Sequence, residues 1–406
     1  MRENSITLLA VETSCDETAL AVLSCQKSGD AKISCSVLGQ AINSQIELHK
    51  QYGGVFPMMA KREHGKNIAP LFLHLLNETT PHINSTVEIP VANYSADLQP
   101  QLNELGAKDP DLLKNFYEFI FNAQIPNPGI NEIAVTTGPG LEPALWVGIT
   151  FARLLGLVWN IPVIASNHMQ GHIASVLFDQ KETFSSYPVH TTHDLQFPTV
   201  ALLISGGHTE LISMRSFIET TLIGKTKDDA IGEAFDKVAR MLDLPYPGGP
   251  EISKLATLAR TENIISQYVF PRPMIHSKDF DFSFSGLKTA VLYTIQKIQA
   301  SGMAIDEHIK KQIALEFENA VTEVLISKTK KALEETNART LAIGGGVIAN
   351  TYIRKAFEEL AREMGVALLI PPFKLCGDNA VMTGLASYIW NDTENTLKAD
   401  GNKMVS

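Results

Sequence analysis

Residues 6–23 read ITLLAVETSCDETALAVL, and they carry the strongest indication of the fold. The apolar runs Ile6–Val11 and Ala19–Leu23 flank a polar segment, which is the pattern of two strands joined by a turn. The pattern recurs at Val200–Ile204 and Thr209–Ser213, around a glycine-containing turn. Two such hairpins in different halves of the chain indicate two lobes built on one plan.

Two further units join a strand to a helix through a glycine-rich turn. The first has a strand over residues 133–137 and a helix over 141–158. The second has a strand over 341–343 and a helix over 347–359. Strands that alternate with helices predict an α/β fold.

The composition is that of an ordinary soluble enzyme, with 45% hydrophobic and 19% charged residues in a chain of 406. No apolar run approaches the roughly 20 residues that span a bilayer, and the first residues show no signal-peptide or transit pattern. A net charge of −10 argues against a protein that holds nucleic acid by bulk electrostatics. The cysteines Cys15, Cys25, Cys35 and Cys376 form no CxxC pair and no disulfide framework, so we expect a cytoplasmic protein.

Three polar segments are predicted to lie at the surface. Asn, Pro and Thr cluster between residues 80 and 130 around one short amphipathic piece at 111–122, so we expect a surface insertion there. The last residues, Asn391–Ser406, are polar and are expected to be frayed. The run Lys61–Lys66 (KREHGK) is either a solvated helix face, which its charge pattern favours, or a local basic rim.

His168 and His172 are the strongest candidates for metal ligands. The sequence HMQGH follows a strand-like run, Ile161–Ala165, and lies in a helix predicted to begin at residue 167. Residues four apart on a helix bring their Cβ atoms to roughly 5–6 Å, so both imidazoles can hold one ion. Two unrelated surface histidines are the alternative. Zinc proteases of the HExxH type need a glutamate after the first histidine, and Met169 in that place argues against peptide hydrolysis.

Glycine-rich turns offer bare backbone N–H groups to an anion. Ser205-Gly-Gly-His208 is either a phosphate cradle or a tight hairpin turn. Gly344-Gly-Gly346 opens the N-terminus of a helix to a polar ligand, and Asn350, about one turn along, could bond a ribose or a base edge. Close strand–helix packing is the alternative there. Tyr246–Pro250 (YPGGP) reads as a rigid turn, and neither glycine cluster matches the Walker loop or the dinucleotide fingerprint.

Carboxylates mark three further places. Asp228 and Asp229 are predicted to begin a helix, where the macrodipole favours acidic side chains. Asp236 lies deep in that helix, which the macrodipole explains less well. Asp378 precedes an apolar helix, Ala380–Trp390, and is either the N-cap of that helix or an oxygen ligand for a metal.

Together these segments resemble the TsaD family of tRNA N6-adenosine threonylcarbamoyltransferases. The matching segments, in order along the chain, are Val11–Thr18, Thr137–Leu141, His168–His172, Ser205–Thr209, Asp228–Lys237, Tyr246–Pro250, Asp281–Lys288, Gly344–Asn350 and Cys376–Asn379. Two features depart from the family pattern. Gln170 stands where the family usually has Glu, and the insertion near 80–125 has no counterpart in the family.

The resemblance implies an α/β protein with the actin-like ATPase (ASKHA) fold, in which two ribonuclease-H-like lobes enclose a nucleotide cleft. Lobe I would comprise residues 1–185 and 371–406, and lobe II residues 186–370. The reaction implied is transfer of the threonylcarbamoyl group from threonylcarbamoyl-AMP to N6 of the adenosine 3′ of the anticodon. The tRNAs concerned read codons that begin with A, and adenylate is the leaving group.

Carried over position by position, the resemblance implies that His168, His172 and Asp378 hold one divalent metal, Fe²⁺ or alternatively Zn²⁺. Asp16 and Glu17 would be catalytic residues that face the cleft. The residues implied to contact the adenylate are Leu203, Ile204, Ser205, Gly206, Gly207, Asp236, Gly249 and Asn350.

The resemblance also implies partners. These are tRNA, a TsaB-like paralogue, a TsaE-like ATPase and an upstream threonylcarbamoyl-AMP synthase, with no membrane. A small-molecule kinase of the same fold is the alternative enzyme, but it would have no use for His168 and His172. A degenerate, non-enzymatic paralogue would lack the metal residues, so their presence argues against that reading.

Overall fold

The computed structural model describes residues 5–27, 33–83, 92–390 and 397–405. The chain divides into two compact units. Unit 1 comprises Met1–Glu47, Val55–Asp194 and Pro371–Val405, and unit 2 comprises Leu48–Gly54 and Leu195–Ile370. The predicted division into lobe I (1–185 and 371–406) and lobe II (186–370) stays a prediction.

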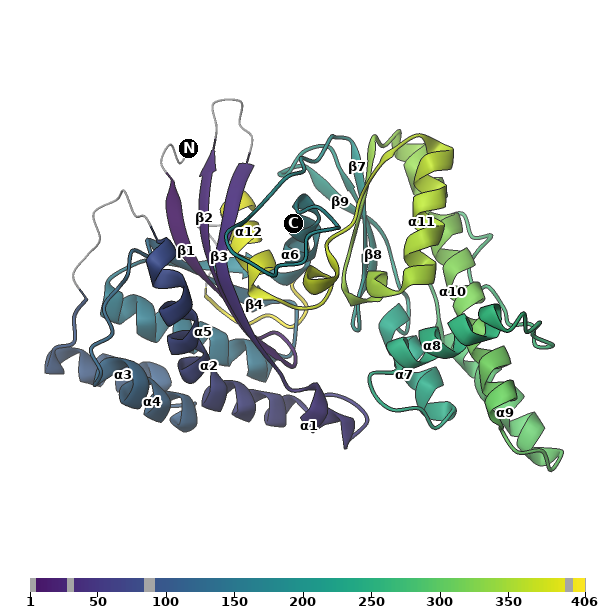
Figure 1. The fold of residues 1–406 in the computed structure, drawn as a ribbon, viewed down its shortest axis with the longest axis horizontal. Coiled ribbons are helices and arrows are strands. Elements are labelled where there is room, and N and C mark those ends of the chain that lie inside the picture. The colour runs from purple at the N-terminus through teal and green to yellow at the C-terminus, as the bar shows by residue number, and fades with distance from the viewer. Residues whose placement is uncertain (1–4, 28–32, 84–91, 391–396, 406) are drawn as a thin grey trace. The chain divides into compact units, whose positions relative to one another are not determined.

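Unit 1 is built on a six-stranded mixed sheet with the strand order β5-β4-β1-β2-β3-β6 (Figure 1). The strands are β1 (Ile6–Glu12), β2 (Glu17–Lys27), β3 (Ile33–Ser44), β4 (Glu132–Gly138), β5 (Val163–Asn167) and β6 (Val189–His190). Strand β1 pairs antiparallel with β2 and parallel with β4, so it lies at the point where the sheet changes direction. The hairpin predicted for residues 6–23 is therefore present as β1 and β2, at the centre of the sheet.

Helices cover both faces of this sheet, because successive residues of a strand point to opposite sides. Leu9 and Val11 of β1 pack in the cluster that contains α2 and α5, whereas Leu8 and Ala10 pack in the cluster that contains α6 and α12. The helices of unit 1 are α2 (Pro57–Thr79), α3 (Gln99–Gly106), α4 (Pro110–Phe116), α5 (Glu142–Trp159), α6 (His168–Ala174) and α12 (Ala380–Trp390). The short helix α1 (Ile46–Lys50) has residues assigned to both units. Helix α6 follows directly after β5, as predicted for the segment that carries the two histidines.

Helix α5 is the one helix among the described residues that is long and apolar enough, by length and composition, to cross a membrane. Its 18-residue apolar stretch is 72% buried inside the structure. Phe151 of α5 contacts Phe72 of α2 edge to face, with ring centroids 5.6 Å apart. Burial and aromatic packing of this kind are those of a core helix.

Unit 2 repeats the plan of unit 1 with a five-stranded sheet in the order β11-β10-β7-β8-β9. Its strands are β7 (Thr199–Ile204), β8 (Thr209–Met214), β9 (Thr220–Lys225), β10 (Thr340–Gly344) and β11 (Ala367–Leu369). Its helices are α7 (Ile231–Met241), α8 (Gly248–Thr261), α9 (Ser285–Ala300), α10 (Glu307–Thr336) and α11 (Thr351–Met364). In each sheet an antiparallel three-stranded meander is extended by parallel strands on the side of its first strand. The predicted fold class, an α/β actin-like ATPase fold, is confirmed.

The segment expected to be a surface insertion contributes to the core of unit 1. Leu102 of α3, Leu112 and Phe116 of α4, and Ile120 are fully buried and belong to the cluster around α2 and α5. The prediction of a surface segment is therefore wrong for residues 99–121. Leu112, Phe116 and Ile120 recur at helical spacing within the amphipathic piece expected at 111–122, and their apolar face packs into the core. Residues 84–91 lie outside the described part of the chain.

The C-terminal residues also differ from expectation. Residues 397–405 are described, and Ala399 is buried in the same core cluster. The backbone N–H of Asp400 donates to the carbonyl of Thr137, with 2.9 Å between nitrogen and oxygen. The prediction of a frayed end is therefore wrong for this part, while residues 391–396 and 406 lie outside the described ranges.

Two cysteines of unit 1 form a disulfide that was not expected. Cys25 of β2 and Cys35 of β3 face each other across the antiparallel pair and are bonded. Cys15 and Cys376 are not part of a disulfide. The pairing depends on the register of two strands, which the spacing of four cysteines along the chain does not indicate.

We expect Phe116→Ala to lower the free energy of unfolding by about 3–5 kcal/mol, because it removes a fully buried aromatic ring. Urea unfolding followed by circular dichroism measures this change. Lys114→Ala on the exposed side of α4 is the matched control, with an expected change within about 0.5 kcal/mol. Equal, small effects of both substitutions would show that α4 is not part of the core.

Candidate metal centre

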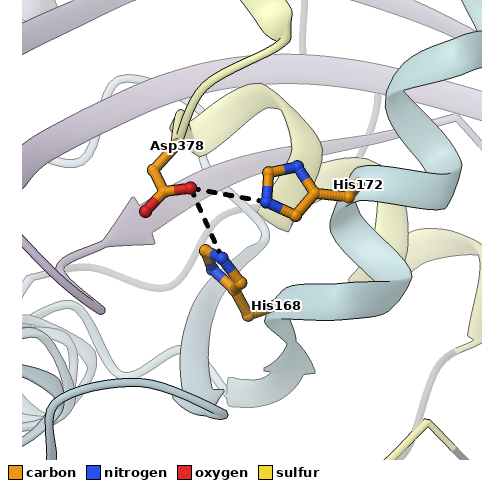
Figure 2. A group of neighbouring side chains, drawn as sticks. All are labelled: His168, His172 and Asp378. Atoms are coloured by element: carbon orange, nitrogen blue, oxygen red, sulfur yellow. Dashed lines mark ion pairs between the residues drawn. The ribbon is translucent and has the colours of Figure 1, made fainter. Parts of the chain in front are cut away.

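His168 and His172 lie one helical turn apart at the start of α6 and face Asp378 (Figure 2). The Nε2 atoms of both histidines lie 3.4 Å from Oδ1 of Asp378, and the two ring centroids are 4.8 Å apart. One ligand atom from each residue lies within 4.8 Å of the other two. Two imidazoles and a carboxylate in this arrangement match the donor set of an iron or zinc site.

Asn167 positions the first histidine by capping α6. Its side-chain oxygen accepts from the backbone N–H groups of Met169 and Gln170, at 2.8 and 3.2 Å. Asn is among the preferred N-cap residues because its oxygen satisfies N–H groups that lack a partner within the helix. The end of β5 and this cap together determine where His168 begins the helix. Gln170 is itself buried on α6, but it is not part of the three-residue group.

Asp378 is not the N-cap of α12. Asn379 has that role, since its Oδ1 accepts from the backbone N–H of Met382 at 3.0 Å. This excludes the N-cap reading of Asp378, whose carboxylate instead faces the two histidines. Burial alone would raise the pKa of Asp378, but His168 and His172 bring it well below its usual range. A lowered pKa favours the charged carboxylate, which is the form that binds a metal ion.

The imidazoles of His168 and His172 have different environments. Burial disfavours the charged form of both. Asp378 and Glu12 outweigh burial for His168 and raise its pKa, whereas burial prevails for His172 and lowers its pKa. Neither ring nitrogen of the fully buried His172 makes a hydrogen bond with any described residue, and Nε2 has only the 3.4 Å ion-pair contact with Asp378. Buried polar atoms without partners are rare in native proteins, and a metal ion at this place would satisfy one of them.

Glu12, at the end of β1, was not identified from the sequence. Its carboxylate is fully buried, accepts from Thr383 Oγ1 at 3.1 Å and from the Ser14 N–H at 2.6 Å, and also binds the hydroxyl of Thr136. Its Oε2 lies 3.3 Å from Nδ1 of His168. A carboxylate on one ring nitrogen fixes the other as the ligand atom, an arrangement common behind metal-bound histidines. Glu12 lies within the segment Val11–Thr18 that resembles the family, but no role was predicted for it.

The turn between β1 and β2 places Asp16 and Glu17 in unit 1, the same unit as His168, His172 and Asp378. Asp16 is buried, and Glu17 accepts from the hydroxyl of Ser44 at 3.1 Å. Burial raises the pKa of Glu17 well above its usual value, and the charges of Asp16 and Asp378 raise it further. The catalytic role predicted for this pair stays a prediction.

Buried His64 of α2 supports the same turn. Its Nε2 lies 3.0 Å from the carbonyl oxygen of Cys15, and its Nδ1 lies 2.7 Å from the hydroxyl of Thr18. The run Lys61–Lys66 is therefore only partly a solvated helix face. Lys61 forms an ion pair with Asp109 at 2.6 Å.

The residues predicted to contact adenylate all lie in unit 2. Leu203 and Ile204 are buried in β7, and Ser205 to His208 form the hairpin turn to β8, with Ser205 N–H donating to the His208 carbonyl at 2.9 Å. A Cβ added to Gly206, Gly207, Gly249 or Gly346 would meet no atom within 4 Å. These glycines therefore leave open space beside the backbone, which fits a ligand as well as a plain turn.

Asn350 and Asp236 are held by hydrogen bonds within unit 2. Asn350 is the N-cap of α11, not a residue one turn inside it, because Gly346–Ala349 form a short 3-10 helix first. Its amide also donates to the buried Glu318 at 2.6 Å. Asp236 accepts from the Gly248 N–H at 2.7 Å, at the start of α8.

Two local predictions around these residues are wrong. Helix α7 begins at Ile231, so Asp228 and Asp229 precede it. Asp228 instead accepts from two backbone N–H groups at the start of α9, and Asp229 forms ion pairs with Lys237 and Lys288. The segment YPGGP is not only a turn, because α8 begins at Gly248. The backbone partners of Asp228 lie 56 and 57 residues away along the chain, so no local pattern indicated them.

The sequence matches the family model described as "TsaD: tRNA N6-adenosine threonylcarbamoyltransferase" over residues 36–93 and 112–385. A protein named tRNA N6-adenosine threonylcarbamoyltransferase from Thermosipho africanus is 40% identical over 381 residues, which is 94% of this chain and 93% of the relative. Proteins of the same name from Polynucleobacter necessarius and Staphylococcus haemolyticus are 38% and 36% identical. They match 94% and 97% of this chain and 91% and 94% of their own lengths.

Two solved structures of HypF share the fold. HypF from T. kodakarensis superposes with a TM-score of 0.52 at 11% identity, over 96% of this chain and 48% of HypF. Full-length HypF in a phosphate- and nucleotide-bound form gives 0.50 at 13% identity, over 97% of this chain and 47% of HypF. The chain thus spans about half of each HypF chain, and the likeness concerns the fold alone.

We expect Glu17→Gln to stabilise the metal-free protein at neutral pH. A carboxyl whose folded-state pKa is raised loses stability as pH rises from its unfolded pKa towards its folded pKa. The amide removes that loss, by about 1.4 kcal/mol for each pKa unit of the shift. Urea unfolding at pH 4 and pH 7.5 measures it, with exposed Glu104→Gln as the control. An equal effect of Glu17→Gln at both pH values would contradict the raised pKa.

Proposed function

The chain belongs to the TsaD family and is a tRNA N6-adenosine threonylcarbamoyltransferase, and we propose that one divalent metal ion held by His168, His172 and Asp378 assists the transfer. The observation that carries this proposal is the convergence of three ligand atoms within 4.8 Å, from residues far apart in sequence. Iron or zinc suits this donor set. When bound, such an ion would polarise the carbamoyl group and offset charge that develops on the phosphate.

The residues around the ion would act by holding its ligands. Glu12 would accept a hydrogen bond from Nδ1–H of His168, which leaves Nε2 free to bind the metal. The hydrogen bonds that Glu12 accepts from Ser14 and Thr383 compensate the burial of its charge. Gln170, where the family usually has Glu, removes one negative charge near the ion without removing a ligand.

We propose that threonylcarbamoyl-AMP is the donor and that unit 2 binds its adenylate part. The open glycines Gly206, Gly207, Gly249 and Gly346 present backbone without side-chain obstruction. The remaining contacts proposed are Leu203, Ile204, Ser205, Asp236 and Asn350. The hydrogen bond from Asn350 to Glu318 and its capping of α11 would hold its amide in one orientation for the nucleotide.

Asp16 and Glu17 are proposed to act on the acceptor side of the reaction. An aromatic amine is a poor nucleophile, so positioning and polarisation carry much of the barrier. A carboxyl with a raised pKa can hold or accept a proton near neutral pH, as general acid–base catalysis requires. Glu17 would take the proton that N6 of the adenosine loses, and its burial together with the charge of Asp16 would keep its pKa high.

The partners proposed are a TsaB-like paralogue, a TsaE-like ATPase and a synthase that makes threonylcarbamoyl-AMP, all in the cytoplasm. The net charge of −10 supports a role for partner proteins, because an acidic chain attracts tRNA weakly by itself. A partner would supply part of the basic surface that binds tRNA.

We expect the purified protein to carry about one divalent metal per chain and to lose it in the variant His168→Ala/His172→Ala. Elemental analysis by mass spectrometry measures the content. The variant His74→Ala/His82→Ala, with the same change at two exposed histidines, is the control and should keep its metal. Full transfer activity of a metal-free His168→Ala/His172→Ala protein would contradict metal-assisted transfer.

Incubation with threonylcarbamoyl-AMP, unmodified tRNA and partner proteins is expected to yield threonylcarbamoyladenosine in the tRNA. Nucleoside analysis by mass spectrometry detects it. Glu17→Gln should lower the rate by about 10²–10⁴-fold if Glu17 is the general base, whereas Glu104→Gln should leave it unchanged. Absence of the product with wild-type protein would overturn the proposed donor, and ADP formation from ATP with a small-molecule acceptor would indicate a kinase.

A further inference from the structure

The C-terminal residues Ala399–Met404, here called the C-terminal strap, contact Asn167, which precedes His168, and the turn after β4 within unit 1. The strap is polar apart from Ala399 and Met404, so burial of apolar side chains does not explain its order. It is held mainly by hydrogen bonds to two places. One is the turn after β4, and the other is Asn167 at the end of β5.

The first connection runs through Asn167. The side-chain amide nitrogen of Asn167 donates to the carbonyl of Met404 at 2.9 Å. The oxygen of the same amide caps α6 through Met169 and Gln170. Because the amide is planar, the bond to Met404 orients the oxygen that caps the helix. His168 is the first residue of that helix. The strap is therefore hydrogen-bonded to the residue that caps the helix at His168.

The second connection runs through the turn Gly138–Gly140. Asp400 N–H donates to Thr137 O at 2.9 Å, and Lys403 Nζ donates to Thr137 Oγ1 at 3.1 Å. A Cβ on Gly138, whose φ is +149°, would lie 1.9 Å from the carbonyl oxygen of Asp400, so the strap fits only against glycine.

The turn Gly138–Gly140 also contacts Ser14, which faces His168. A Cβ on Gly140 would lie 2.7 Å from the carbonyl oxygen of Ser14, and the N–H of Leu141 donates to that oxygen at 2.7 Å. The hydroxyl of Ser14 lies 3.1 Å from Nδ1 of His168. The strap, the turn, Ser14 and His168 are thus in continuous contact, independently of the route through Asn167.

We infer that the C-terminal strap is a positioning element of the metal centre: it holds His168 in its ligand orientation through Asn167 and through the turn at Gly138–Gly140. The strap supplies no ligand. It lies outside the family match, which ends at residue 385. The inference rests on the proposed metal site, but its effect on α6 exists without any ion.

Asn167→Ser tests the strap with little change to the helix cap. Serine is about as good an N-cap as asparagine, but it lacks the amide donor to Met404. Asn402→Ser is the matched control, because the side chain of Asn402 is exposed and its place in the strap depends on its backbone N–H. A chain that ends at Lys398 removes the strap altogether.

Hydrogen exchange of the metal-free protein and Zn²⁺ titration against a chelator are the two measurements. We expect the amides of residues 168–174 to exchange about tenfold faster in Asn167→Ser and in the shortened chain, and Zn²⁺ to bind about tenfold more weakly. Asn402→Ser should match wild type in both. Exchange at residues 353–361 of α11 in unit 2 reports whether the shortened chain keeps its fold elsewhere.

Wild-type exchange and wild-type Zn²⁺ affinity in both Asn167→Ser and the shortened chain would overturn the inference. Wild-type values in Asn167→Ser alone would overturn the route through Asn167. Faster exchange with unchanged Zn²⁺ affinity would also overturn it, because the strap would then order α6 without positioning a ligand. If the wild-type chain binds no Zn²⁺ and no Fe²⁺, the proposed metal site fails. The exchange comparison alone then supports or overturns the part of the inference that concerns α6.

Discussion

The buried carboxylate of Glu12 is the interaction on which the candidate site depends. It comes from β1 and binds the hydroxyl of Thr136 in β4, the hydroxyl of Thr383 in α12 and the imidazole of His168 in α6. A charge without water around it is costly unless it is paired and hydrogen-bonded. The four elements must therefore keep their relative positions for the charge to be tolerated. This constraint links the central hairpin of unit 1 to the metal group.

The three proposed ligands are all buried or half-buried, but their pKa values shift differently because their charged neighbours differ. His168 has carboxylates on both sides, and its pKa is raised. His172 has burial as its main influence, and its pKa is lowered. The histidines lower the pKa of Asp378, although burial alone would raise it. Asp378 and Glu12 together bring two carboxylates to this place. Two negative charges favour the binding of a divalent cation.

Unit 2 repeats the plan of unit 1 but uses glycine where unit 1 uses charge. Its hairpin turn has Gly206 and Gly207 with open space beside them, at the place where the first hairpin has Cys15 and Asp16. Bare backbone suits a ligand that is recognised through hydrogen bonds to N–H groups. Carboxylates and imidazoles suit a cation and proton transfer. One architecture thus offers two kinds of chemistry in two units.

Several features of this protein are determined by the sequence alone because they depend on neighbours in the chain. The hairpin of residues 6–23 and the spacing of His168 and His172 follow from local backbone geometry. The motifs from residue 11 to residue 379 were specific enough to indicate the family, and the family match agrees.

Only the tertiary structure decided which partner each polar group meets. It assigned the cap of α12 to Asn379 and left Asp378 to the histidines, and it buried Phe116. It also revealed Glu12 behind His168 and ordered the C-terminal strap. Hydrogen bonds between residues hundreds of positions apart depend on the packing of whole elements, which no local pattern records.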